Sequence, residues 1–283
     1  MILDENWFTE QDSPTGCAFS LRIKAKIHEE RTPFQKIAIY ETTRFGNLMT
    51  LDDIVMLTDR DNFIYHEMLS HPILFTHSNP RQVAIIGGGD CGTLREVLRH
   101  PEVEHLIQIE IDERVTRLSE QYFPTLCEFN NDSRAQFCFE DGIKWMANAP
   151  PNSLDIIIVD STDPLGPGEG LFTVDFYRDC RRVLGESGLL VQQSESPLLH
   201  LSLLLSIHQA MREAGFDTTR SLLFPQCVYP SGWWTATLAG KSDLTVFREE
   251  DARNKSFETR YYNADIQKAS FVLPNFLAEA LPD

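Results

Sequence analysis

The chain has 283 residues, 42% of them hydrophobic, and a formal net charge of -17 from 25 basic and 42 acidic side chains. This length supports a substantial core, and the composition is that of a globular protein rather than a disordered or fibrous one. So acidic a surface repels phosphate backbones, which excludes nucleic acid as an expected partner and favours cationic substrates only weakly.

The N-terminus and the cysteines indicate a cytoplasmic protein. The opening MILDENWFTE is acidic and lacks the basic-then-apolar order of a secretory or transit segment. The six cysteines show no CxxC and no paired spacing, which favours a reducing compartment. The apolar run at residues 198–207 is too short to cross a membrane. The eight histidines form no metal-binding spacing, so we expect no metal.

The first part of the chain has the pattern of a small antiparallel sheet. Apolar and polar side chains alternate between residues 19 and 58, with turn signals between the runs. Residues 61–75 then have helical spacing, and Asn79 with Pro80 breaks that helix. We therefore expect an N-terminal β domain with its linking helix over residues 1–78.

From residue 82 the pattern changes to strand, turn, helix and strand. Seven segments have strand patterns: 83–86, 105–109, 135–139, 154–159, 188–193, 217–224 and 233–239. Helical segments follow the first five, which predicts an α/β fold with a Rossmann-like, doubly wound and mostly parallel sheet over residues 79–240. Residues 241–283 are predicted to form a helical extension packed on this domain, with a helix near 265–280.

Five carboxylates stand at or just after the ends of these predicted strands: Asp90, Glu110, Asp141, Asp160 and Asp163. In open α/β sheets a ligand lies beyond the carboxyl ends of the strands, so these acids are expected to converge on one crevice. Packing like charges together is costly unless a cation lies between them. The crevice is therefore predicted to bind a positively charged ligand.

The sequence GGGDCG at residues 87–92 follows a strand and opens a helix, as nucleotide-binding loops do. An aspartate stands where a dinucleotide site needs room for pyrophosphate, which disfavours NAD and FAD. Glu110 follows the next strand, at the position from which an acid binds a ribose diol, and Asp141-Gly142 follows the third. Although a solvated glycine turn explains the first loop equally well alone, the three loops together predict a nucleoside site without a phosphate site, as for an adenosyl sulfonium.

Asp160 and Asp163 lie on the loop after strand 154–159 and can both face a ligand. One carboxylate can accept a proton from an attacking amine while the other holds a cation. Turn formation is the alternative interpretation of this loop. It explains Pro164 and the following GPG, but it gives no reason for Asp160.

Several segments together resemble the polyamine aminopropyltransferases, with the spermidine synthases as the nearest group: DRDNFIYHEM, VAIIGGGDCGTLREV, IEID, EDG, VDSTDPLGPGEGLF, YPSGWW and YYNADIQKASFVLP. The resemblance implies a small N-terminal β domain on a methyltransferase-like Rossmann domain, assembled as a homodimer or homotetramer. The implied reaction transfers the aminopropyl group of decarboxylated S-adenosylmethionine to putrescine, giving spermidine and 5′-methylthioadenosine. The decarboxylated donor is then a co-substrate, and no cofactor is permanently bound.

The same resemblance implies roles for individual residues. Asp160 would be the catalytic base, with Tyr65 beside it. The nucleoside donor would be held by Gln35, Asp90, Glu110, Asp141, Gly142 and Pro167. The amine would contact His66, Asp160, Asp163, Gln193 and Tyr229. For Tyr65 and His66, the residues alone would indicate only a helix packed on the core.

Elementary electrostatics agrees with these roles. Asp90 near the donor's ammonium would attract the decarboxylated donor and repel the carboxylate of ordinary S-adenosylmethionine. The diamine arrives protonated and only a neutral amine can attack, so Asp160 must orient the nitrogen and take its proton. No metal or covalent intermediate is required, because the sulfonium is already a good leaving group.

The sequence departs from the family pattern at two places, and three alternative functions stay open. Cys91 stands where many relatives have glycine, and Trp233 and Trp234 either shorten the acceptor pocket or simply pack in a late strand. The alternatives are an S-adenosylmethionine-dependent small-molecule methyltransferase, an aminopropyltransferase for cadaverine, agmatine or spermidine, and a catalytically silent binding protein. A methyltransferase needs a partner for its donor's carboxylate, whereas this site offers Asp90 and Asp160.

Overall fold

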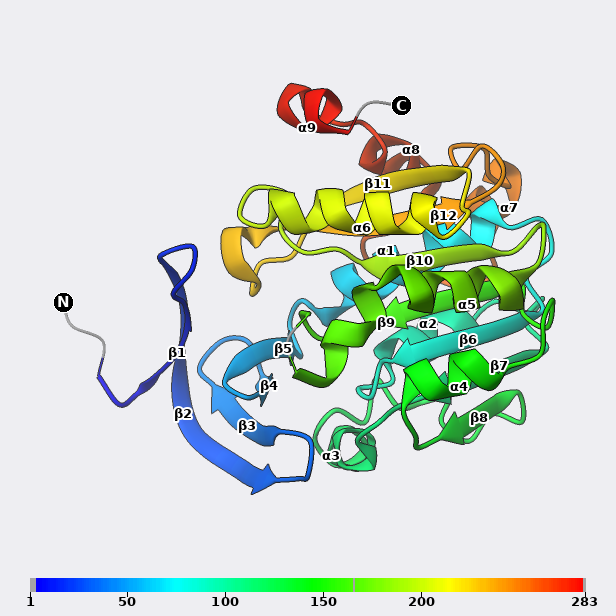
Figure 1. The fold of residues 1–283 in the computed structure, drawn as a ribbon. Helices are drawn as coiled ribbons and strands as arrows, with labels where there is room; N and C mark the ends of the chain where they lie inside the picture. Colours follow the sequence, from blue (N-terminus) through cyan, green and yellow to red (C-terminus); the bar gives the residue numbers. More distant parts are fainter. Residues whose placement is uncertain (1–3, 165, 282–283) are drawn as a thin grey trace.

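The structure is a computed structural model that describes residues 4–164 and 166–281 and contains two sheets (Figure 1). The first sheet is antiparallel, and its five strands neighbour one another in chain order. They are β1 (Trp7–Asp12), β2 (Cys17–Arg31), β3 (Lys36–Thr42), β4 (Asn47–Leu51) and β5 (Ile54–Thr58). The sequence pattern began this sheet at residue 19 and missed β1, which pairs with the first residues of β2.

Helix α1 (Asn62–Thr76) joins the two sheets and is buried on nearly all sides. The helix expected over residues 61–75 is therefore confirmed. Its buried carboxylate, Glu67, accepts hydrogen bonds from the backbone N–H groups of residues 260–262 and so anchors the C-terminal segment. This burial holds Tyr65 and His66 in place at the carboxyl edge of the second sheet.

The second sheet has seven strands in the order β11-β12-β10-β9-β6-β7-β8. They are β6 (Gln82–Gly87), β7 (His105–Ile109), β8 (Ala135–Cys138), β9 (Ile156–Asp160), β10 (Leu189–Gln193), β11 (Thr218–Pro225) and β12 (Trp233–Gly240). Neighbouring strands are parallel except where β12 is involved. The predicted α/β fold, a Rossmann-like sheet of the methyltransferase type with a small antiparallel N-terminal domain, is confirmed.

Helices cover both faces of the second sheet because its strands are apolar on both sides. Ala84 and Ile157 point to the face covered by α4 (Gly142–Asn148), α5 (Val174–Leu184) and α6 (Leu201–Glu213). Val83 and Ile158 point to the face covered by α1 and α2 (Gly92–Leu98). Helix α3 (Glu113–Tyr122) instead packs on the first sheet, so it connects the two parts of the molecule.

The C-terminal extension contains three short helices rather than one long one. They are α7 (Glu249–Arg253), α8 (Ala264–Ser270) and α9 (Asn275–Ala280). The single helix expected near residues 265–280 was wrong, because Pro274 precedes α9 and restricts the residue before it to extended backbone. Two 3-10 helices, η1 (Gly166–Phe172) and the single-turn η2 (Pro230–Gly232), complete the elements.

The strand order reverses between β6 and β9, and this reversal positions the site. Chain connections run from β6 towards β7 on one side and from β9 towards β10 on the other. The ends of the two strands pair directly, with Gly87 opposite Asp160. Loops diverge at such a point and leave a crevice for ligands. The first sheet packs on α3 through Ile37, Met49 and Leu118, and closes one side of this crevice.

Candidate active site

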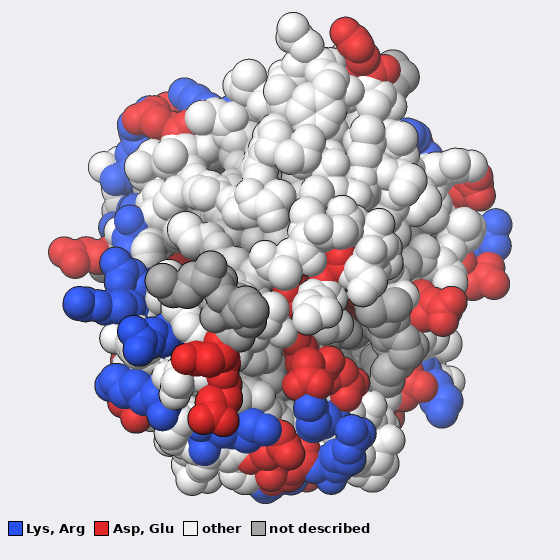
Figure 2. Space-filling model, turned by 90° about the vertical axis from the view of Figure 1, so that its left-hand side faces the viewer, with Lys and Arg blue, Asp and Glu red and all other residues white. Residues whose placement is uncertain are grey.

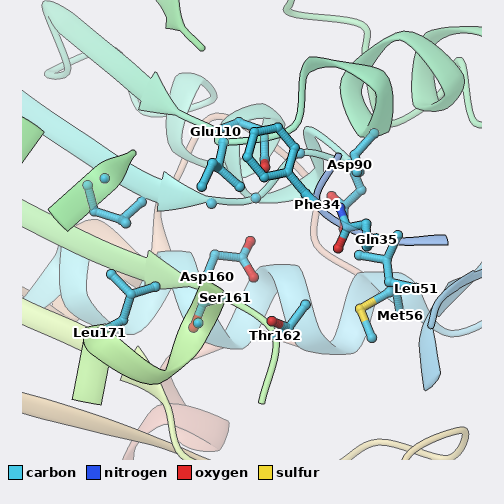
Figure 3. Close-up of a pocket in the computed structure, with 18 of the residues that line it drawn as sticks. Phe34, Gln35, Leu51, Met56, Asp90, Glu110, Asp160, Ser161, Thr162 and Leu171 are labelled. Atoms are coloured by element: carbon cyan, nitrogen blue, oxygen red, sulfur yellow. The ribbon is translucent and has the colours of Figure 1, made fainter. Parts of the chain in front are cut away.

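Two adjoining pockets lie at the carboxyl edge of the second sheet. The first is formed by the loops after β6, β7, β8 and β9 together with residues of the first sheet, and Figure 3 shows Asp90, Glu110 and Asp160 around it. The second lies between β1 and the loops that follow β9 and β10. The pockets share a wall that consists of Met56, Tyr65, Ser161, Thr162 and Tyr229.

Glycines allow the backbone to form the floor of the first pocket. Gly87 has a φ of 85°, and a Cβ there would lie 2.2 Å from the backbone oxygen of Asp160. At Gly142, a Cβ would lie 2.6 Å from Cγ2 of Ile86. Larger residues at either position would push the loop away from the sheet, so a flat ligand can approach the backbone closely.

Glu110 and Gln35 provide the polar groups at one end of the first pocket. The Glu110 carboxylate accepts a hydrogen bond from the backbone N–H of Asp112 at 2.8 Å, and burial raises its pKa to about 7. The Gln35 side chain donates to Asp112 at 3.0 Å, which fixes its amide beside Glu110. A buried carboxylate with unused acceptor capacity suits a vicinal diol, whose two hydroxyl groups both donate.

Asp141 lies at the start of α4 and serves as its N-cap. Its carboxylate accepts hydrogen bonds from the backbone N–H groups of Ile143 at 2.9 Å and Lys144 at 3.4 Å. These bonds fix the side chain at the rim of the first pocket. The same residue therefore ends one strand connection, starts a helix and presents an acceptor to a ligand.

Asp160 lines the first pocket and directly precedes Ser161 and Thr162 of the wall that the two pockets share. The Tyr65 hydroxyl donates to its Oδ1 at 2.7 Å and the Thr93 hydroxyl donates to its Oδ2 at 2.6 Å. Burial raises the pKa of Asp160 to about 6, and the nearby Asp90 carboxylate adds to the rise. Asp160 is thus a carboxylate above neutral pH, held in one orientation, with a pKa suited to general base catalysis.

Asp90 and His66 form a buried pair beside Asp160. The imidazole Nε2 of His66 lies 3.2 Å from Oδ1 of Asp90, and the backbone N–H of Gly92 donates to the same oxygen at 2.6 Å. Burial alone would lower the pKa of His66, but Asp90 outweighs it and the pKa is raised. Gly92 makes room for the ring, since a Cβ there would lie 2.1 Å from it. The pair places one carboxylate at the pocket edge.

The second pocket is rich in acids. Burial raises the pKa of Asp163 to about 9, and the nearby Glu195 carboxylate adds to the rise. Burial also raises the pKa of Glu10 to about 7, against the effect of the Val55 N–H that donates to it at 2.7 Å. Without a bound cation these acids keep protons, whereas a cation between them would favour their charged forms.

We expect the stability of the ligand-free protein to fall between pH 7 and about 8.5. Because the pKa of Asp163 is raised from 3.8 to about 9, the folded state keeps a proton that the unfolded chain has lost. One such proton lowers the free energy of unfolding by about 2 kcal/mol over this range. Thermal unfolding should show a fall in Tm of roughly 3 °C.

Asp163→Asn should remove most of this slope. The control Asp175→Asn, at a side chain that is 89% exposed, should keep it. His77, His100 and His208 do not interfere, because their pKa values are lowered and they are neutral in both states above pH 7. An unchanged slope in Asp163→Asn would show that another group holds the proton.

Most of the residues predicted for the site line these pockets. Those at the first pocket are Gln35, Tyr65, Asp90, Glu110, Asp141, Gly142, Asp160 and Tyr229. Those at the second are Tyr65, Asp163, Gln193 and Tyr229. His66 lines neither pocket and reaches the first only through Asp90, so its position does not support the expected amine contact. Pro167 lies outside the side chains that the structure describes.

The sequence reasoning missed several residues that line the pockets: Glu10, Asp12, Phe34, Glu195 and His200. It also missed Thr93, which lines neither pocket but donates to Asp160. Glu10 and Asp12 are two residues apart, which places both acids on one face of a strand, but WFTEQD has no apolar–polar alternation that would predict the strand. Glu195 and His200 follow a strand end, as the recognised acids do, but no spacing marks them.

The two tryptophans have different positions. Trp234 is buried, lines the second pocket and packs edge-on against Tyr229, with ring centroids 4.6 Å apart. Trp233 lines neither pocket, and its ring packs edge-on against Phe276 of α9, with ring centroids 5.9 Å apart. One tryptophan is therefore a wall of the second pocket, and the other packs on the C-terminal helix.

The arrangement defines a class of protein. Among the described residues that line the first pocket there is no Lys, Arg or His, so a phosphate or a donor carboxylate would find no cation there. Acidic side chains also lie within the central hollow of the face shown in Figure 2. A methyltransferase-type fold with these features defines an enzyme that transfers a group from a positively charged nucleoside to a second cationic substrate.

Comparison with known proteins identifies the family. The chain matches the spermidine synthase tetramerisation domain over residues 6–59 and the spermine/spermidine synthase domain over residues 62–250. It is 62% identical over 283 residues to the polyamine aminopropyltransferase of Thioalkalivibrio sulfidiphilus, covering 99% of each chain. It is 60% identical over 277 residues to that of Methylococcus capsulatus, covering 98% of this chain and 97% of the relative. The chain belongs to the polyamine aminopropyltransferase family.

A solved structure agrees with this membership. The crystal structure of a spermidine synthase in complex with the transition state analogue AdoDATO has a TM-score of 0.94 and 36% sequence identity, and the match covers 98% of this chain and 95% of the other. The protein is therefore a transferase of polyamine biosynthesis. Family membership decides against the methyltransferase and the catalytically silent protein among the alternatives.

No helix within residues 4–164 and 166–281 is long and apolar enough to cross a membrane. In the same part of the chain, no group of three or more His, Cys, Asp or Glu side chains is arranged to hold a metal ion.

Proposed function

We propose that this enzyme transfers the aminopropyl group of decarboxylated S-adenosylmethionine to putrescine, giving spermidine and 5′-methylthioadenosine. The observation that carries the proposal is the pair of adjoining pockets whose shared wall includes Ser161, the residue after Asp160. The first suits a positively charged nucleoside without phosphate, and the second suits a dication. Gln35, Glu110, Asp141 and Gly142 hold the nucleoside in this proposal, with Pro167 in the adjoining loop.

The acceptor lies in the second pocket with its reacting nitrogen at Asp160. Asp163, Gln193 and Tyr229 line the space along its carbon chain and around its remote ammonium. Glu10 adds a carboxylate to the same pocket. His66 acts as a positioning residue, because its contact is with Asp90 rather than with either pocket.

Asp160 serves as the general base. The reacting ammonium gives a proton to the Asp160 carboxylate, and the freed nitrogen attacks the propyl carbon that is bonded to sulfur. The carbon–nitrogen bond forms as the carbon–sulfur bond breaks, and the bonding electrons pass to sulfur, which becomes a neutral thioether. Tyr65 and Thr93 keep the carboxylate aligned during this step through their hydrogen bonds to it.

The distinction between acceptors depends on the second pocket. Cadaverine has one more methylene than putrescine, agmatine ends in a guanidinium, and spermidine carries a third amine. Trp234 lies along this pocket and limits its cross-section, which favours the slim, short diamine. We therefore place putrescine before the other three as the substrate.

A product assay tests the proposal directly. Purified enzyme with decarboxylated donor should convert putrescine to spermidine, with kcat/KM at least roughly tenfold above that for cadaverine, agmatine or spermidine, since one methylene or one misplaced charge costs about 1–3 kcal/mol. Chromatography of the amine products measures this. Preferred conversion of another amine would replace putrescine as the acceptor, and methyl transfer from ordinary S-adenosylmethionine would overturn the reaction.

The assembly of the enzyme and its location in the cell are part of the same proposal. The match to a tetramerisation domain covers the first sheet, and we propose that the chain assembles through it as a homodimer or homotetramer. The six cysteines are free thiols, which supports a cytoplasmic location.

A further inference from the structure

His200 lies between two acids at the end of the second pocket. It immediately precedes α6, and its two ring nitrogens face different carboxylates. Nδ1 lies 3.1 Å from Oε2 of Glu195, and Nε2 lies 3.5 Å from Oδ2 of Asp12. A neutral imidazole carries one N–H and can serve only one of these carboxylates, whereas the protonated ring can serve both. Both ring nitrogens therefore lie at ion-pair distance from a carboxylate, and a ring that carries both protons would be the cation between two acids.

The backbone is shaped to keep Glu195 in this pocket. Glu195 has a φ of 65°, a left-handed conformation that is strained for a residue other than glycine. The backbone N–H and the hydroxyl of Thr235 donate to its carbonyl oxygen at 2.9 Å and 2.8 Å and hold this conformation. The side chain is only 2% exposed and faces the pocket.

The buried Glu195 carboxylate, when ionised, needs a nearby cation to balance its negative charge. Among the described residues, neither of its carboxylate oxygens has a hydrogen bond of good geometry. Burial raises its pKa, and its contact with Asp163 requires a shared proton unless a cation is present. His200 is the one basic side chain among the described residues that line this pocket, against the carboxyl groups of Glu10, Asp12, Asp163 and Glu195.

We infer that the His200 imidazolium occupies the place of a third ammonium, so that the second pocket accepts diamines and discriminates against triamines. This inference rests on the proposed function and names the residue that sets its acceptor class. A diamine places one nitrogen at Asp160 and its second near Asp163. A triamine would extend its third cation towards Asp12 and Glu195, where His200 already supplies the positive charge and repels it.

His200→Gln tests the inference by removing the charge at similar size, and His200→Arg keeps the charge. The measured quantity is the ratio of kcat/KM for spermidine to kcat/KM for putrescine. We expect this ratio to rise roughly tenfold or more in His200→Gln, because a like charge at close range is removed. It should stay near the wild-type value in His200→Arg and in the control Glu213→Gln, an exposed position on α6.

The pH dependence of inhibition supplies a second test. Arginine keeps its charge at every pH whereas an imidazole can lose it, so the pH dependence of competitive inhibition by spermidine against putrescine should differ between wild type and His200→Arg. Glu10, Asp12, Asp163 and Glu195 also face this region, and burial raises the pKa of Glu10, Asp163 and Glu195. His200→Arg isolates the imidazole, because it retains those acids and should show a weaker pH dependence.

The outcomes separate this inference from the proposed function. If putrescine is converted but the ratio is the same in His200→Gln and in wild type, His200 does not set acceptor class and the inference fails alone. If His200→Gln is unfolded, an equal pH dependence of inhibition in wild type and His200→Arg overturns the inference. If no diamine is converted by the wild type, the proposed function itself fails.

Discussion

Asp160→Asn should lower kcat by about 10³-fold, because general base catalysis contributes about 10²–10⁴-fold to proton transfer. The substitution keeps the size of the side chain and removes its basicity. Tyr65 can still donate to the amide oxygen, and the Thr93 hydroxyl can turn to accept from the amide N–H, so both contacts to the side chain survive. We therefore expect the loss to appear in the chemical step rather than in folding or donor binding.

Single-turnover rates and binding of 5′-methylthioadenosine measure the two effects separately. The variant should bind this product within about threefold of the wild-type affinity, since the nucleoside groups of the first pocket are unchanged. Asp175→Asn, on the exposed side of α5, controls for the general effect of losing an acid. A variant that keeps a tenth or more of the wild-type rate would remove Asp160 from the role of base.

Asp90→Asn should change the choice of donor. The carboxylate lies at the edge of the first pocket, and no Lys, Arg or His lines that pocket among the described residues. An ammonium on the donor gains a charge-assisted hydrogen bond there, worth about 1.5–3 kcal/mol, while the carboxylate of ordinary S-adenosylmethionine is repelled. We expect kcat/KM for the decarboxylated donor to fall roughly 10–100-fold.

The same variant should bind ordinary S-adenosylmethionine more tightly than the wild type, measured as its inhibition constant against the decarboxylated donor. Losing Asp90 also removes the charge that raises the pKa of His66, so the ring becomes neutral and the site gains no unpaired cation. Glu113→Gln, at an exposed side chain of α3, provides the matched control. Equal discrimination between the two donors in wild type and Asp90→Asn would show that selectivity arises elsewhere.

The second sheet and its acids could be predicted because each depends on local pattern. Apolar runs of strand length followed by Asp90, Glu110 or Asp160 mark strand ends, and the rule for open sheets then brings those ends together. No long-range information is required for that step. The convergence of these acids on one pocket is therefore contained in the order of the segments.

Other parts of the site depend on contacts between distant segments. Glu10 and Asp12 reach the second pocket because β1 pairs with β2 at the edge of the first sheet, and no local pattern places that edge beside β10. The direction of His66 is decided by α1, which is buried almost all round, so helical periodicity selects no single face. The role inferred for His200 depends on its contact with Asp12, a residue far away in the sequence.

Most residues that line one pocket do not line the other, and this separation has an evolutionary consequence. The glycine loop and Glu110 line the first pocket alone, whereas Glu10, Asp12 and Glu195 line the second alone. Mutations in the opening strand or in the segment after β10 can therefore accumulate without disturbing the machinery that handles the sulfonium. A lineage with this architecture could adopt a new amine while inheriting its alkylating chemistry intact.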